Sequence, residues 1–146
     1  MIRKGRITDL PAITRIRTSV TENHLSVEQM AQIGITHDTL GRMMQSGALG
    51  CWVAEDDGKI AGFAMAHRGD GEIFALFLDR EHEGKGYGSA LLNACETWLK
   101  QNGVAVASLA TDPATRAFSF YQRRGWQPTG ETAGHFATDA ILTKRL

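Results

Sequence analysis

Three glycines in alternate positions separate an apolar run from an amphipathic helix, and this arrangement constrains the fold more than any other feature of the chain. The run Glu72–Asp79 is apolar on both faces, as a central strand should be. Gly84, Gly86 and Gly88 follow, and the residues after them repeat apolar side chains at helical spacing until a stop at Gly103. The sequence therefore predicts a buried strand, a tight glycine turn and a helix in immediate succession.

A glycine turn that opens a helix is suited to binding an anion. Glycine lets the backbone turn tightly and lets a ligand approach the N–H groups. The first N–H groups of a helix have no partner in the helix and carry a partial positive charge. The P-loop is excluded because Gly-Lys-Ser/Thr does not occur, and the dinucleotide fingerprint is excluded because Ser89 stands where it needs glycine. An ordinary glycine-rich loop and another nucleotide-binding protein remain open on these residues alone.

The other predicted elements surround this segment. Thr8 is expected to cap a first helix, Ser26 to begin a second, and Asp56–Lys59 to form a hairpin turn. The expected strands are Met1–Ile7, Cys51–Glu55, Ile60–His67, Val104–Ala110 and two within Trp126–Leu146 around a turn near Gly134, and further helices are expected over Asp38–Gln45 and Pro113–Arg124. This order predicts a mixed sheet with helices on its faces.

Length and composition limit the classes of function. The chain has 146 residues, which fits one domain, and its 16 Lys+Arg balance 16 Asp+Glu. A neutral chain argues against nucleic acid or an anionic membrane as the main partner. The sequence contains no apolar run of 18 residues, so no membrane-spanning helix is expected. No apolar signal core follows Arg3 and Lys4, so the expected compartment is the cytoplasm, with Cys51 and Cys95 reduced in the core.

The glycine segment resembles motif A of the GCN5-related N-acetyltransferase (GNAT) family, Gln/Arg-x-x-Gly-x-Gly/Ala. Glu83 stands at the Gln/Arg position, with Gly86 and Gly88 at the two small positions. The segment Tyr121–Trp126 is similar to the family's Tyr-x-x-x-Gly-Phe, and the element order matches throughout. The resemblance implies one α/β (α+β) domain over residues 1–146 with the GNAT fold, a mixed, mostly antiparallel sheet of about seven strands with helices on both faces. It also implies an acetyl-CoA-dependent N-acyltransferase.

The resemblance implies where acetyl-CoA binds. The glycine turn would hold the pyrophosphate, and the strand before it would pair with the pantetheine arm as with an added strand. A backbone N–H, that of Leu76 or Phe77, would face the thioester oxygen. The cofactor-binding residues implied are Leu76, Phe77, Leu78, Glu83, Gly84, Lys85, Gly86, Tyr87, Gly88, Ser89, Ala117, Phe118 and Tyr121.

Two residues are candidates for proton transfer. Tyr121 lies where this family commonly has the general acid for the leaving thiolate, and its alternative role is a packed core tyrosine. Glu72 lies where histone-type members carry a catalytic glutamate, and its alternative is a solvated strand start. Glu22, Asn23 and His24 are rivals, because the family's acceptor site is lined where the first two helices meet.

Two departures from the family pattern support a second function. Glu83 brings a carboxylate to a pyrophosphate site, and Ala114 replaces an asparagine that touches pantetheine in many members. The alternative is a catalytically weak acetyl-CoA sensor.

The acceptor is expected to be an amine on a small molecule or peptide, with amino acids, antibiotics and protein N-termini all open. A homodimer is one expected state. The histidines lack metal-ligand spacing, so no metal is expected.

Overall fold

The computed structural model describes residues 1–19, 26–133 and 138–146. Seven strands form one sheet in the order β1-β2-β3-β4-β5-β7-β6. Every neighbouring pair is antiparallel except β4 and β5, which run parallel. The strands are β1 Ile2–Lys4, β2 Leu49–Asp56, β3 Lys59–His67, β4 Glu72–Leu78, β5 Val106–Thr111, β6 Gln127–Ala133 and β7 Thr138–Arg145. The expected mixed, mostly antiparallel sheet of seven strands is confirmed.

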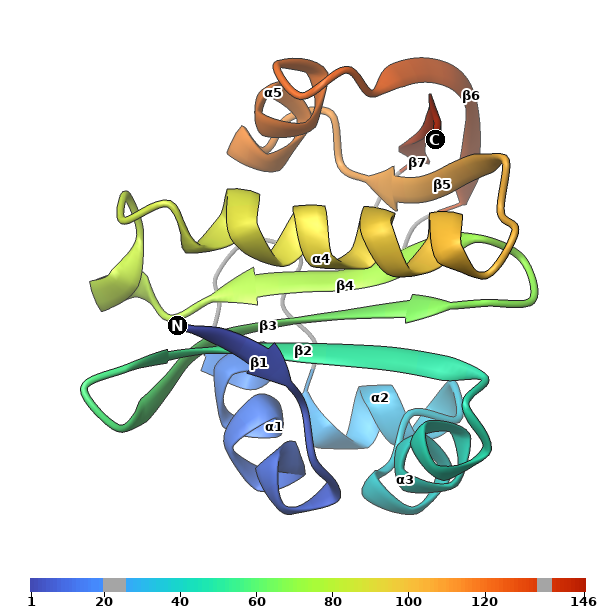
Figure 1. The fold of residues 1–146 in the computed structure, drawn as a ribbon. Coiled ribbons are helices and arrows are strands. Elements are labelled where there is room, and N and C mark those ends of the chain that lie inside the picture. The colour runs from blue at the N-terminus through green and yellow to red at the C-terminus, as the bar shows by residue number, and fades with distance from the viewer. Residues whose placement is uncertain (20–25, 134–137) are drawn as a thin grey trace.

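Helices cover both faces of this sheet (Figure 1). The helices are α1 Leu10–Ser19, α2 Val27–Gln32, α3 His37–Ser46, α4 Tyr87–Gln101 and α5 Arg116–Gln122, with short 3-10 turns η1 at Ile7–Asp9 and η2 at Arg80–His82. On one face, α1 packs against β3 and α3 against β2, and on the other α4 packs against β2, β3 and β4. In residues 1–19, 26–133 and 138–146, no helix has the length and apolar character needed to cross a bilayer.

Local side-chain caps fix where the helices begin. Ser26 caps α2 as expected: its hydroxyl accepts a hydrogen bond from the Gln29 N–H at 3.1 Å. The expected cap at Thr8 is wrong, because Thr8 lies inside η1. The carboxylate of Asp9 instead accepts from the Arg6 N–H at 2.7 Å. Asp9 also accepts two hydrogen bonds from the Arg3 guanidinium, which ties the start of α1 to β1.

The core is divided by the sheet into two clusters of buried side chains. The cluster under α1 and α3 includes Ile13, Phe63 and Met65, and the cluster under α4 and α5 includes Leu91 and Trp126. The two cysteines are free thiols, one in each cluster. Burial raises the pKa of the Cys51 thiol to about 12, so it stays protonated at neutral pH.

Candidate active site

The glycine turn leads directly into α4, as the sequence predicts. Gly84 and Gly86 have φ of +79° and +84°, in the left-handed region that residues with a side chain rarely adopt. Gly86 is the residue immediately before α4, so its left-handed conformation sets the direction in which the helix leaves the turn. Apart from the adjoining residues of the turn itself, no heavy atom of the described residues lies within 4 Å of the place where a Cβ would stand on either glycine. The turn is therefore a backbone surface open to a ligand.

The backbone donors of this turn are available to an anion. Within the described part of the chain, no N–H from Gly84 to Ser89 donates a hydrogen bond to another group. Ala90 is the first residue to donate, to the Gly86 carbonyl at 3.2 Å. Unpaired donors converging on a helix N-terminus bind phosphate oxygens, so the residues present fit the pyrophosphate of acetyl-CoA.

Glu83, the acidic departure at this turn, is paired with a cation. The Arg116 guanidinium at the start of α5 lies 3.3 Å from one Glu83 carboxylate oxygen and 3.4 Å from the other. Both side chains are well exposed, so the pair contributes little to stability. Its consequence is local: the positive charge of Arg116 offsets the carboxylate at the mouth of the turn. This pairing could not be predicted from the sequence, since 33 positions separate the two residues.

A second arginine reaches the first turn of α4. Arg124 donates from Nε to the Ser89 hydroxyl at 2.7 Å, and its Nη2 donates to the same oxygen. The guanidinium also stacks over the Phe120 ring, 3.8 Å from its centroid. These contacts hold a cation beside the free N–H groups, which strengthens the anion site. Sequence reasoning missed Arg124, because nothing local links it to Ser89.

The side chain of Lys85, the lysine of the glycine turn, is held by an ion pair with Asp56. Lys85 donates from Nζ to the Asp56 carboxylate at 2.9 Å, and His82 lies 3.5 Å from the same oxygen. The hydrogen bond from Lys85 lowers the pKa of Asp56 below its ordinary value. The β2–β3 hairpin therefore anchors the turn. The contribution of Lys85 to a ligand would come from its backbone N–H.

The two parallel strands separate soon after they meet. β4 and β5 pair only at Glu72 and Ser108 among the described residues. Beyond this point Leu76 and Leu78 lie on an edge of β4 that β5 does not cover, which leaves backbone groups open for an added strand. The expectation that this segment parts from its neighbour is confirmed as geometry.

The pairing of β4 with β3 shows which donors face the gap. The Asp79 N–H donates to the Ala61 carbonyl at 2.7 Å. Hydrogen-bonded and non-hydrogen-bonded pairs alternate along an antiparallel ladder, so Phe77 also bonds to β3. The N–H groups of Leu76 and Leu78 consequently point away from β3, into the gap.

A β-bulge in β4 sets this register. Met65 pairs with Ala75 and Ala66 pairs with Ile73, which leaves Phe74 as the extra residue. Phe74 and Ala75 are consecutive, yet both line the same cavity instead of facing opposite sides of the sheet. The bulge thus decides which β4 backbone groups face the gap.

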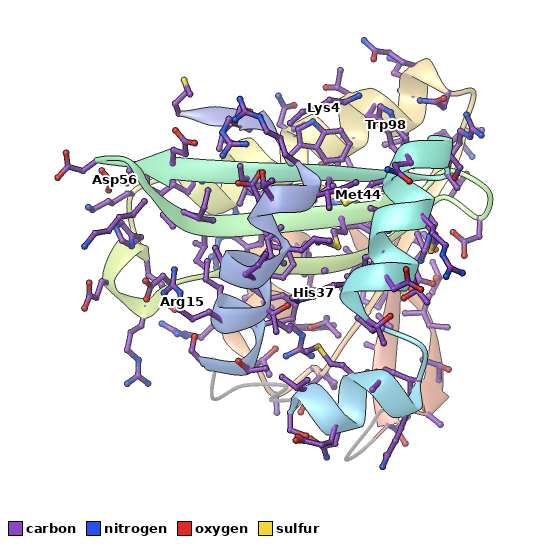
Figure 2. The ribbon with its side chains drawn as sticks, turned by 90° about the horizontal axis from the view of Figure 1, so that it is seen from below. Lys4, Arg15, His37, Met44, Asp56 and Trp98 are labelled. Carbon is purple, nitrogen blue, oxygen red and sulfur yellow. The ribbon has the colours of Figure 1, made fainter. Side chains whose placement is uncertain are left out.

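A cavity of about 530 Å³ lies between the sheet and the helices α1, α2 and α3. Its walls are mostly apolar, with polar groups at a few places. Glu72 lines it from the start of β4, and burial together with Asp70 raises the pKa of this carboxyl above its ordinary value. His37, at the start of α3, also lines it and hydrogen-bonds Thr14 across to α1 at 2.6 Å (Figure 2).

Tyr121 lies on the other side of the sheet from Glu72. Its side chain is 7% exposed and packs in the cluster under α4, with its ring 6.1 Å from that of Trp126. Burial raises its pKa, so the phenol is neutral at physiological pH. No hydrogen bond joins its hydroxyl to a residue that the structure describes. Ala117 and Phe118, in the first turn of α5, pack against the same cluster.

The remaining candidates are placed as follows. Glu22, Asn23 and His24 lie outside the described residues. Ala114 lies in the loop before α5, where its N–H donates a hydrogen bond to the Asp112 carboxylate at 2.9 Å. Among the described residues, no three His, Cys, Asp or Glu side chains gather as a metal site would require.

Solved structures share this fold across the whole chain. An N-acetyltransferase PaiA from Thermoplasma acidophilum, solved in complex with coenzyme A, superposes with a TM-score of 0.81 at 21% identity, covering 100% of this chain and 98% of its own. A ribosomal-protein-alanine N-acetyltransferase from Brucella melitensis gives 0.79 at 20% identity, with 100% and 99% covered. The fold is therefore that of N-acetyltransferases, as predicted.

The sequence assigns the family. The model of the acetyltransferase (GNAT) family matches residues 13–126, and the chain belongs to this family. A curated relative, the mycothiol acetyltransferase of Propionibacterium freudenreichii, is 30% identical over 128 residues, which cover 80% of this chain. The matched region spans 41% of the length of that relative.

Proposed function

We propose that this chain transfers the acetyl group of acetyl-CoA to an amine acceptor by direct attack in a ternary complex. The observation that carries the proposal is the glycine turn with its unpaired N–H groups, followed by α4 and preceded by a strand with an open edge. The turn fits a pyrophosphate, and the edge fits the amide-bearing pantetheine arm. The thioester then supplies an acetyl group activated for attack by a neutral amine.

The Leu76 N–H is our candidate for the oxyanion donor. The sequence left Leu76 and Phe77 open, and the register of β4 favours Leu76, because Phe77 bonds to β3. A fixed donor directed at the thioester oxygen stabilises the negative charge that develops there during attack.

Tyr121 and Glu72 are our candidates for proton transfer. A neutral, buried phenol can give its proton to the departing thiolate, and the raised pKa of Tyr121 keeps that proton in place. The raised pKa of Glu72 brings a carboxylate closer to the range useful for accepting a proton from an ammonium group. Because Glu72 lines the cavity, it can act on an acceptor there through water.

Thiol release from acetyl-CoA in the presence of a panel of amines tests the proposal. The expected result is release that depends on one class of amine and follows the acetylated product one to one. Tight acetyl-CoA binding without release over any amine would instead support the sensor function. Greater thermal protection by ATP or NAD than by CoA would refute the acetyl-CoA site itself.

A further inference from the structure

Arg17 is a cation on the apolar side of α1. It lies four residues after Ile13, which is buried in the core, so helical spacing turns it toward the sheet. Its guanidinium stacks over the Phe77 ring of β4, 4.2 Å from the centroid. It also lines the cavity described above.

Among the residues that the structure describes, none forms a hydrogen bond with this guanidinium. Its Nη1 is buried and makes no hydrogen bond, and no ion pair joins Arg17 to a residue in the ranges that the structure describes. Burial lowers the pKa of Arg17 to about 10, which still leaves it charged at neutral pH. A half-buried cation without an ion-pair partner among the described residues destabilises a folded protein, so a charge kept here indicates a group that is supplied from outside.

The shape and lining of the cavity indicate which kind of anionic ligand could pair with Arg17. Its carboxylates Glu72, Asp112 and Asp139 come from the start of β4, the end of β5 and β7, whereas Arg17 sits over Phe77, toward the other end of β4. On the Arg17 side the cavity is lined by apolar side chains such as Ile13 and Phe63, together with the hydroxyl-bearing Thr14 of α1. The volume of about 530 Å³ suits a small molecule.

Arg17 is also close to the proposed site of acetyl transfer. Its guanidinium stacks on the ring of Phe77, the residue after Leu76, so the cation and the Leu76 N–H belong to the same end of β4. If Arg17 holds an anionic group of the acceptor, an amine a few atoms away in the same molecule would lie toward the Leu76 N–H. In an α-amino acid, the carboxylate and the amine are separated by a single carbon.

We propose that Arg17 binds the carboxylate of the acceptor, and that the acceptor is a small amino acid with an apolar side chain. The assignment rests on the proposed acetyltransferase function and adds a substrate class to it. Arg17 would orient the carboxylate, the apolar walls would receive the side chain, and the amine would be directed at the thioester.

Matched acceptors test this assignment. L-Leucine, L-methionine and L-phenylalanine are compared with their amides, which keep the side chain and the amine but lose the negative charge. The amides have the less basic amine, so at neutral pH a larger fraction of each amide is in the neutral form that attacks the thioester, and a preference for the acids runs against this supply of reactive amine. Since hydrogen bonds to charged groups contribute strongly, we expect kcat/KM to be about 10- to 100-fold higher for at least one acid than for its amide.

Variants of α1 assign the effect to Arg17. Arg17→Gln should remove the preference by raising KM for the acid about 10-fold or more, with the amide and acetyl-CoA constants unchanged. Arg17→Lys should keep part of the preference, because it keeps the charge without the fork of donors. Arg15→Gln is the matched control: Arg15 is exposed on the same helix and lies on the side away from α3 in Figure 2, and this variant should behave as wild type.

The two levels of the proposal fail differently. Equal use of acids and amides by the wild type, or an equal loss of both in Arg17→Gln, would refute the role of Arg17 while leaving the acetyltransferase function intact. If no amine causes thiol release, the acetyltransferase function fails. Arg17 can then still be tested by measuring whether the amino acids raise the melting temperature of the CoA-loaded protein. A rise that Arg17→Gln abolishes supports the anion site at Arg17. No rise in the wild type refutes that site.

Discussion

Replacing the amide of Leu76 by an ester tests the oxyanion donor at the level of one atom. Incorporating the α-hydroxy analogue of leucine at position 76 exchanges the N–H for an oxygen and leaves the side chain unchanged. Because this N–H points away from β3, the exchange removes no donor from the sheet. The perturbation therefore removes a donor from the gap between β4 and β5, and its effect on the fold is limited to the Ala75 carbonyl, which as an ester carbonyl is a weaker acceptor in the ladder with β3.

The expected magnitude follows from the value of one preorganised donor. Removing one oxyanion donor costs about 3 kcal/mol of barrier, and each 1.36 kcal/mol corresponds to a factor of about ten in rate, so kcat should fall about 100-fold. The KM for acetyl-CoA should stay within a few-fold, since the glycine turn is untouched. Thiol release at saturating acceptor measures kcat directly.

The same exchange at Phe77 is the control. Its N–H bonds to β3, so the ester should lower the free energy of unfolding by about 1 kcal/mol and leave kcat near wild type. Chemical denaturation of both esters measures the stability difference. A kcat unchanged by the Leu76 ester, or lowered equally by both, would refute the reasoning from strand register.

Further predictions address the other parts of the site. Tyr121→Phe should lower kcat about 10-fold or more with little change in acetyl-CoA affinity, and an unchanged kcat would remove Tyr121 as the acid. Gly86→Ala introduces a side chain at φ +84°, which costs about 1–2 kcal/mol, and calorimetry should show weaker CoA binding with α4 retained. Arg17→Met should raise the free energy of unfolding by about 1 kcal/mol, because relief of a partly screened charge that has no ion-pair partner among the described residues outweighs the lost stacking on Phe77. A less stable variant would show that Arg17 holds the fold together. The raised pKa of Glu72 predicts that kcat/KM falls on the acid side at a pH above the ordinary pKa of glutamate, as the carboxylate is protonated, and Glu72→Gln should remove that limb of the pH profile.

Local signals allowed much of the fold to be predicted from the sequence. The turn from Gly84 to Ser89 is recognisable because left-handed glycines and a helix start depend on neighbouring residues alone. The cap at Ser26 depends on Gln29, three positions away. Thr8 failed as a cap because Asp9, the neighbouring residue, took that role with help from Arg3 on β1.

Tertiary structure decided how the site is completed. The β-bulge and the pairing with β3 decide that the N–H of Leu76, and not that of Phe77, faces the gap. Neither feature can be predicted from the sequence of β4 alone. The partners of Glu83 and Ser89 are arginines 33 and 35 positions away. One signal was readable, since Arg17 interrupts the apolar side of α1, but its stacking on Phe77 needed the packed structure.

The sequence by itself therefore determined the glycine turn before α4, the order of elements and the family. The structure decided which backbone donors face the gap, which cations lie beside the turn and which half-buried charge lines the cavity under α1, α2 and α3. The physical reason is range. Turns and caps form between residues a few positions apart, whereas strand register and charge pairing depend on contacts that exist only once the sheet and its helices are packed together.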